Sequence, residues 1–383
     1  MDTAPITGLD ELDKHLDDLV QDPTLPLIPK LFDDVELQLT ESNIPPLIPR
    51  FLPRLTIILK QYAQDPAILA SLTIKLLGPV SFTQVLQLAS QDSLIQALDS
   101  PAPAANLLAM TVLHKAAANP ADVAILSLMM PLIGAFIRRW LAAPQVEVGQ
   151  KGGKVLGDLL DIDCELPPPL PPASGPGGDT DLVLRKTPGH GKLWHLLFNE
   201  PAMYRLLLDL CAGRHPDTAG NAHQLSLAQG RLLRILPRLA ALDFRAVSQS
   251  QITAPMVVHL TNGHSQDQDN SDSVPSGPDP HPRPGEGLLQ FAALRMVQRE
   301  DLLMHLSLVD FFETFVGLMR VTEHTALKLE TIRGLLSKAT AGDEVLRDAL
   351  LSLPDRAVEE EADGLRAWLS EVMPGEAVRL AMR

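Results

Sequence analysis

PLIPKLF (residues 26–32) and PLIPRFL (residues 46–52) are two copies of one pattern, and their spacing decides the fold class of this chain. The second copy begins 20 residues after the first. In each copy a proline stands near the start of an apolar helical pattern, where its missing N–H group costs little. One helix in about 20 residues gives a helix pair in about 40, which is the period of armadillo and HEAT repeats.

Helical patterns fill most of the 383 residues. Two long examples, residues 107–118 and 152–162, begin 45 residues apart, which is again the spacing of such repeats. The 33 prolines fall mostly between the apolar runs or in a first helical turn. Aromatic residues make up only 4%, so the core must be aliphatic, and no long alternation of apolar and polar residues predicts a sheet. We therefore predict an all-α protein with an armadillo/HEAT-like α-solenoid, a curved superhelix of helical repeats.

Two segments interrupt the helical patterns: residues 166–187, which start with LPPPLPPASGPGG, and residues 261–287, which are rich in Pro, Asp, Ser and Gly. We predict that both are disordered insertions, because such compositions cannot bury enough apolar surface to fold. Repeats in a solenoid contact only their neighbours, so an insertion between two helices is tolerated. The predicted organisation is helical repeats over residues 1–165, a linker or loop over residues 166–187, and further repeats over residues 188–383. The proline-rich stretch is interpreted as a spacer, with a docking peptide for a proline-binding domain as the alternative.

The composition lowers the expectation of several protein classes. The formal net charge is −15, whereas a nucleic-acid binder normally carries a basic surplus, so DNA or RNA binding is not expected. Cys164 and Cys211 form no C-x-x-C pair, which predicts neither a disulfide framework nor a zinc site and suits a reducing, intracellular compartment. The acidic first residues predict no secretory signal. The most apolar run, residues 123–137, is shorter than the roughly 20 residues of a membrane span and is divided by Pro131, so we predict a buried helix pair and no membrane partner.

Two glycine-rich stretches, GQKGGK (residues 149–154) and GHGK (residues 189–192), invite comparison with phosphate-binding loops. A P-loop needs G-x-x-x-x-G-K-[ST] after a strand, and here Val155 or Leu193 stands where Ser or Thr must hold magnesium. We predict a turn at both places. The histidines form no H-E-x-x-H or similar ligand pair, and the sequence has no G-x-S-x-G elbow. We therefore expect no enzymatic activity, no metal, no cofactor and no small-molecule substrate.

The candidate interaction surface is a row of arginines in GRLLRILPRLAALD, residues 230–243. Arg231, Arg234 and Arg238 are spaced i, i+3, i+7, so they share one helix face. One interpretation is a solvated face opposite the leucines of the same helix. The other is that this helix lines the groove of the solenoid, where a basic row would meet an acidic protein partner.

Two further stretches flank the proline-rich break: KVLGDLLDIDC (residues 154–164) before it and GHGKLWHLLFNEPAMY (residues 189–204) after it. With the helical-repeat architecture, they resemble the fungal proteasome-assembly chaperones, historically labelled DNA mismatch repair protein HSM. The animal counterpart of that family is 26S proteasome non-ATPase regulatory subunit 5. The resemblance covers the whole chain in architecture, and its sharper features cover residues 152–204. The loop at residues 261–287 and the irregular repeats depart from the family pattern, so no contact residues are carried over.

The resemblance implies a chaperone for assembly of the base of the proteasome regulatory particle. Such a protein would hold the C-terminal domain of one AAA-ATPase base subunit in its concave surface, with other base subunits as further partners. Its mechanism would be steric and reversible, without a nucleotide or metal of its own. We expect a cytoplasmic location, with the nucleus as a second compartment. The alternative function is another α-solenoid scaffold or adaptor, including a factor associated with DNA mismatch repair.

Overall fold

The computed structural model describes residues 6–165, 187–250, 252, 285–376 and 379. Within these ranges every regular element is a helix, which confirms the all-α prediction. The chain divides into two compact units, Met1–Ile162 and Asp163–Arg383. The predicted linker at residues 166–187 and the predicted loop at residues 261–287 lie outside the described residues, apart from their last one and three positions.

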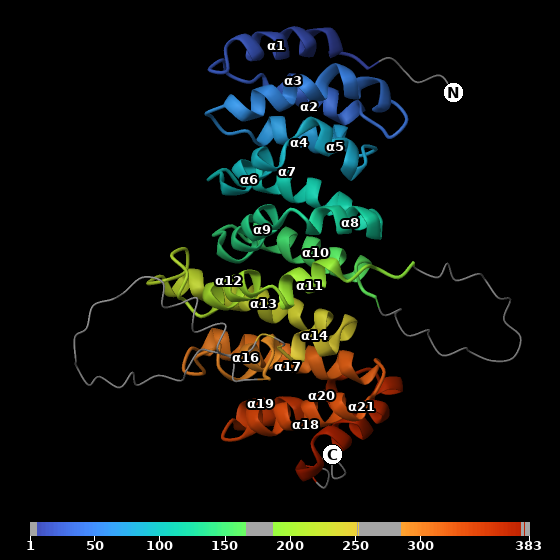
Figure 1. Ribbon diagram of the computed structural model, residues 1–383, viewed down its shortest axis with the longest axis vertical. Coiled ribbons are helices and arrows are strands. Elements are labelled where there is room, and N and C mark those ends of the chain that lie inside the picture. The colour runs from blue at the N-terminus through green and yellow to red at the C-terminus, as the bar shows by residue number, and fades with distance from the viewer. Residues whose placement is uncertain (1–5, 166–186, 251, 253–284, 377–378, 380–383) are drawn as a thin grey trace, which may run out of the picture. The chain divides into compact units, whose positions relative to one another are not determined.

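The described part of the first unit contains ten α-helices joined by short turns (Figure 1). They are α1 Leu9–Gln21, α2 Pro29–Gln38, α3 Ile48–Gln61, α4 Ala67–Leu76, α5 Phe82–Leu88, α6 Gln91–Asp99, α7 Pro103–His114, α8 Pro120–Ser127, α9 Met130–Ala142 and α10 Val146–Ile162. Two single 3-10 turns, η1 Pro45–Leu47 and η2 Lys115–Ala118, precede α3 and follow α7.

The two PLIP stretches begin helices, as predicted. Pro29 is the first residue of α2, and Pro49 is the second residue of α3. Proline is tolerated at both positions because the first N–H groups of a helix have no partner within the helix. In α3 the residues Phe51, Leu55 and Ile58 follow at helical spacing and are buried. Burial of each such side chain stabilises the fold by roughly 1.5–3 kcal/mol.

Helices of the first unit pack mainly on helices that are near in sequence. α1 contacts α2 and α3, α4 contacts α2, α3 and α7, and α10 contacts α7 and α9. Figure 1 shows the resulting layers, each lying on the one before it. Such an arrangement is consistent with an α-solenoid, in which each repeat covers the apolar face of its neighbour.

The expected turn at residues 149–154 is wrong, because GQKGGK lies inside α10. Its glycines serve a close contact between helices instead of a turn. A Cβ atom added to Gly152 would lie 2.6 Å from Cδ1 of Trp140 on α9. Trp140 is almost fully buried, with 1% of its surface exposed. Glycine at position 152 therefore makes room for the indole, a use of glycine that a sequence pattern does not distinguish from a turn.

The apolar run at residues 123–137 forms a helix pair, as predicted. α8 and α9 are bent by 95° at the break between them. Leu126, Ile133 and Phe136 are among the side chains that the pair buries in the first unit.

The described part of the second unit contains ten further α-helices and a 3-10 turn. They are α11 Lys192–Phe198, α12 Pro201–Cys211, α13 Ala222–Leu242, α14 Phe244–Ser248, α16 Leu288–Leu294, α17 Leu302–Arg320, α18 Ala326–Thr340, α19 Glu344–Leu351, α20 Leu353–Arg356, α21 Glu359–Val372 and η3 Pro374–Glu376. The stretch GHGKLWHLLFNEPAMY, residues 189–204, enters two helices, because Pro201 starts a new one.

The long helices α13 and α17 pack against each other at the centre of the second unit. α17 buries Phe311, Phe312, Phe315 and Val316, and it also contacts α19 and α21. By length and composition alone, α17 would be long and apolar enough to cross a membrane. In the folded unit these apolar side chains are part of the core, which accounts for its composition.

Candidate functional site

The helix that carries the predicted arginines, α13, is held firmly in the second unit. Its start is capped by Asn221, whose Oδ1 accepts the backbone N–H of Gln224 at 3.1 Å. Further along, the buried Gln229 side chain donates to two backbone carbonyls, those of Cys211 at 3.0 Å and Met296 at 2.8 Å. These bonds fix the rotation of α13 about its axis, and therefore the direction in which its arginines lie.

The three arginines differ in their environments. Arg231 is buried, with 9% of its surface exposed, whereas Arg234 is exposed and Arg238 is half-buried. Burial and, to a smaller extent, the neighbouring positive charge of Arg234 together lower the pKa of Arg231 to about 10. The predicted common face is thus not uniformly solvated, since one of its members has been largely removed from water.

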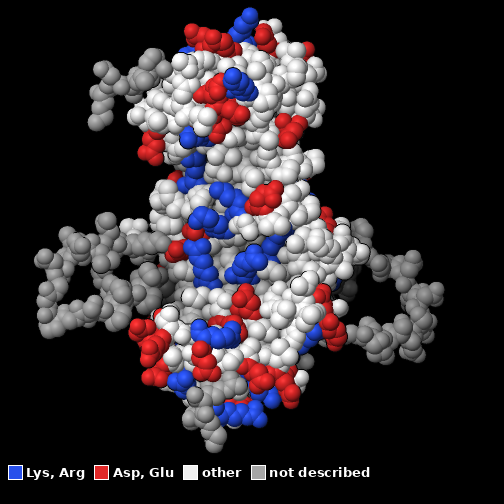
Figure 2. Space-filling view, turned by 180° about the vertical axis from the view of Figure 1, so that it is seen from behind, with Lys and Arg blue, Asp and Glu red and all other residues white. Residues whose placement is uncertain are grey.

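Exposure makes Arg234 the member of this row that a partner can reach first. A fully solvated face, the plainer of the two interpretations, does not fit the burial of Arg231. Figure 2 shows Lys and Arg side chains together with Asp and Glu side chains on both units. The three arginines of α13 bring positive charges together on one helix, although the chain as a whole carries −15.

Asp163 joins the two stretches on which the family resemblance rests, residues 154–164 and 189–204. Its carboxylate accepts backbone N–H groups from three residues at the start of α11: His190 at 3.3 Å, Leu193 at 2.6 Å and Trp194 at 3.3 Å. Burial raises the pKa of the Asp163 carboxyl, and these N–H donors offset part of that effect. The end of KVLGDLLDIDC and the start of GHGKLW therefore form one structural feature, here called the Asp163 clasp.

Two glycines allow the backbone to approach Asp163 closely enough. Gly189 donates its N–H to the carbonyl of Cys164 at 2.8 Å, and Gly191 donates to the carbonyl of Asp163 at 2.9 Å. A Cβ atom on Gly189 would lie 2.1 Å from the carbonyl carbon of Asp163, and Gly191 has φ +63°. Residues 189–191 of GHGK lie outside the helices, and Lys192 is the first residue of α11. Since the Asp163 carboxylate occupies the N–H groups of this helix start, they are not directed at a phosphate.

The two cysteine thiols are enclosed in the fold. Neither Cys164 nor Cys211 is part of a disulfide, and both are buried. Burial raises the pKa of Cys211 to about 12, so its nucleophilic thiolate is not populated near neutral pH. Within the described ranges, no three His, Cys, Asp or Glu side chains are grouped as metal ligands would be.

A family model matches part of the first unit. Residues 9–135 match the family model described as DNA mismatch repair protein HSM3, N terminal domain. The resemblance expected from the sequence is thereby confirmed. The HSM3 match covers about a third of the chain, from α1 into the first half of α9, and stops before residues 152–204, where the quoted stretches lie. No curated protein matches the chain.

Sequence reasoning found the stretches around the Asp163 clasp but not the clasp itself. Each half was visible as a pattern, yet the hydrogen bonds join residues that are about 30 positions apart in the chain. One signal was available: an Asp directly after an apolar helix is followed, beyond the insertion, by two glycines and a helix start, and Asp is a residue type that caps helix starts.

Proposed function

We propose that this protein is a chaperone for assembly of the base of the proteasome regulatory particle. The match of residues 9–135 to the HSM3 N-terminal domain carries the proposal, because the sequence resembles the proteasome-assembly chaperones that bear this label. The stacked helices of each unit support it. A chain of helical repeats offers long exposed helix faces, which suits stoichiometric binding of a protein more than turnover of a substrate.

The proposed partner is the C-terminal domain of one proteasomal AAA-ATPase subunit, held on the concave surface of an armadillo/HEAT-like solenoid. The proposed contact includes the row of arginines on α13 (Arg231, Arg234 and Arg238), here called the α13 row, in which Arg234 is exposed. A basic side chain on this helix would steer and orient an acidic surface of the partner. Binding would be steric and reversible in the cytoplasm, and release would follow maturation of the regulatory particle.

A second function, suggested by the label, is a role in DNA mismatch repair. It is favoured by the row of three arginines on α13, which could contact phosphates. The net charge of −15 opposes it, since contact with phosphates has to overcome long-range repulsion. The two functions differ in a simple property: DNA binding would weaken steeply as salt rises, and one-to-one protein binding would weaken much less.

The experiment that tests the proposed contact compares the chain with its Arg234→Glu variant in calorimetric binding to the ATPase domain. We expect reversal of this exposed charge to weaken binding by at least about fivefold, chiefly through slower association. Arg245→Glu is the matched control, because Arg245 on α14 is also exposed and the charge change is the same. Equal affinities for Arg234→Glu, Arg245→Glu and the unaltered chain would remove α13 from the contact.

Reversal of all three arginines is a poorer test. Arg231 is buried, so a glutamate there would destabilise the second unit and confuse a folding defect with a binding defect.

A further inference from the structure

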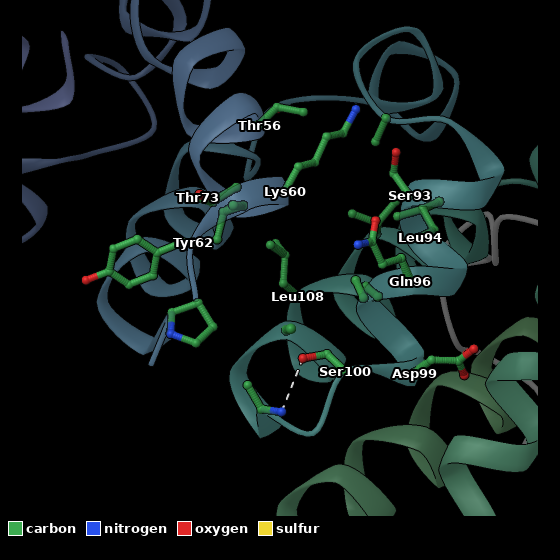
Figure 3. Close-up of a pocket in the computed structure, with 18 of the residues that line it drawn as sticks. Thr56, Lys60, Tyr62, Thr73, Ser93, Leu94, Gln96, Asp99, Ser100 and Leu108 are labelled. Carbon is green, nitrogen blue, oxygen red and sulfur yellow. Dashed lines mark hydrogen bonds between the residues drawn. The ribbon is translucent and has the colours of Figure 1, made fainter. Parts of the chain in front are cut away.

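A cavity of about 640 Å³ opens in the first unit, lined by residues of α3 to α7 and of the turns between them (Figure 3). Leu59 of α3, Leu94 of α6 and Leu108 of α7 contribute apolar surface to it. Several of the other lining residues are alanines, whose small side chains leave the space unfilled. Ligand sites in proteins have volumes of roughly 300–1,000 Å³, so this cavity is large enough to bind a specific group.

Helix α3 borders this cavity and also packs against helix α1. On one side, Arg54 of α3 pairs with Asp17 of α1 at 2.7 Å, and Arg50 and Arg54 both pair with Asp13. At 100° per residue, Thr56 and Lys60, which line the cavity, point on average about 120° away from Arg50 and Arg54 around the axis of α3. The cavity therefore lies next to α3 on a different side from α1.

The docked helix shows what kind of helix α3 accepts. α1 has the sequence LDELDKHLDDLVQ, and its Leu12, Leu16 and Leu19 are fully buried. Its acidic residues lie at the edge of this apolar face and meet the basic side chains of α3. An acidic, leucine-rich amphipathic helix thus matches both the apolar surface and the charge of α3 on that side.

The side of α3 that lines the cavity also combines apolar surface with a basic side chain. Lys60 is exposed, and Figure 3 shows its side chain extending between Thr56 and Ser93. Among the described residues, no carboxylate is paired with Lys60. The one acidic residue of the lining, Asp99, is paired with Arg138 of α9. The net charge offered to an occupant of the cavity is therefore positive.

We propose that this cavity docks an amphipathic α-helix of a partner protein, with leucine-type side chains entering the cavity and an Asp or Glu reaching Lys60. Helix-in-groove recognition uses apolar anchors at i, i+3, i+4 and i+7, and the row of apolar lining residues from α3, α6 and α7 suits such anchors. This inference goes beyond the function proposed above. The cavity belongs to the first unit and the α13 row to the second, so either can stand if the other fails.

The probe is a fluorescein-labelled synthetic peptide with the sequence of α1, Leu9–Gln21, titrated with the full chain and followed by fluorescence anisotropy. A matched peptide with Asn and Gln in place of its Asp and Glu residues has the same shape without the acidic charge. We expect saturable one-to-one binding of the acidic peptide and weaker binding of the neutral one. Lys60→Glu should weaken binding of the acidic peptide by at least about fivefold.

Two further variants separate the cavity from other sites. Ala105→Phe, from α7, fills the cavity and should weaken binding by more than about tenfold. Ala97→Phe, from α6, replaces it if Ala105→Phe does not fold. Lys75→Glu is the control, because Lys75 is an exposed lysine of α4 that does not line the cavity, and it should bind within about twofold of the unaltered chain.

Three results would overturn the proposal. The first is the absence of saturable binding, and the second is equal affinity for the unaltered chain, Lys60→Glu and Ala105→Phe. The third is binding that is lost in Arg54→Glu but unchanged in Lys60→Glu, because the peptide would then be displacing α1 from its own place.

Discussion

Leu193 donates its backbone N–H to the carboxylate of Asp163 at 2.6 Å, although 30 residues separate them in the chain. The same carboxylate accepts from His190 and Trp194, so one buried side chain caps the start of α11 from a distance. The residues on either side of the proline-rich segment are thereby held next to each other. This arrangement answers how a helical-repeat unit accommodates a long interruption: the chain leaves and returns at one fixed point.

Asp163→Ala should lower the free energy of unfolding by about 2 kcal/mol, because several N–H groups at the start of α11 lose their acceptor. Asp163→Asn retains one acceptor oxygen and should cost about half as much. Urea denaturation monitored by the fluorescence of Trp194, which lies in this helix, measures both. A stability unchanged in Asp163→Ala would show that the clasp is incidental to the fold.

Gly152→Ala should destabilise the first unit by about 1–3 kcal/mol, since the added methyl group overlaps the buried ring of Trp140. Gly153→Ala is the matched control. Its Cβ atom would lie 3.5 Å from Nε1 of Trp140, an ordinary contact, and alanine favours the helix by up to about 1 kcal/mol. Thermal unfolding of the two variants should shift in opposite directions or leave Gly153→Ala unchanged. Equal destabilisation by both would contradict the packing described for α9 and α10.

Local sequence patterns were sufficient to predict most helices and the residues at which several of them start. Pro29 and Pro49 fix φ at positions where helices begin, a local effect that needs no knowledge of the fold. Gly152 shows where such reasoning fails, because its use depends on Trp140 in the preceding helix. The exposure of Arg231 could not be predicted for the same reason. Its spacing placed it on a helix face, but only the packing of the second unit determines that this part of the face is buried. The cavity beside α3 arises between helices and leaves no trace in any one of them.

A second buried cation gives a prediction about pH. Lys328 on α18 is 5% exposed, and its Nζ donates to Thr322 Oγ1 and, at 3.1 Å, to the carbonyl of Glu323. The ammonium also lies 5.6 Å from the centroid of the Phe244 ring. Burial lowers the pKa of Lys328 from its ordinary value of 10.5 to about 8, and the charge of Glu323 offsets only part of this effect.

Between pH 8 and pH 10.5 the lysine is protonated in the unfolded chain and neutral in the folded one. The unfolded state then binds more protons, so the free energy of unfolding rises with pH, by at most about 1.4 kcal/mol per pH unit. Lys328→Met lacks this contribution. The stability of the unaltered chain, measured relative to Lys328→Met by urea denaturation, should increase from pH 8 to pH 10.

Lys338→Met is the control for this titration, because Lys338 is an exposed residue of the same helix. The unaltered chain and Lys338→Met should keep a constant difference in stability over the same range. If the difference between the unaltered chain and Lys328→Met is also constant, Lys328 titrates alike in both states and the assigned direction is wrong.

The proposed function requires that this chain bind one proteasomal ATPase subunit through that subunit's C-terminal domain. The most direct test is calorimetric titration of the purified chain with each of the six isolated C-terminal domains of the proteasomal ATPases, with double-stranded DNA as a control. The account predicts tight one-to-one binding to a single domain, and no binding of DNA at physiological salt. Failure of a folded chain to bind any of the six domains would contradict it.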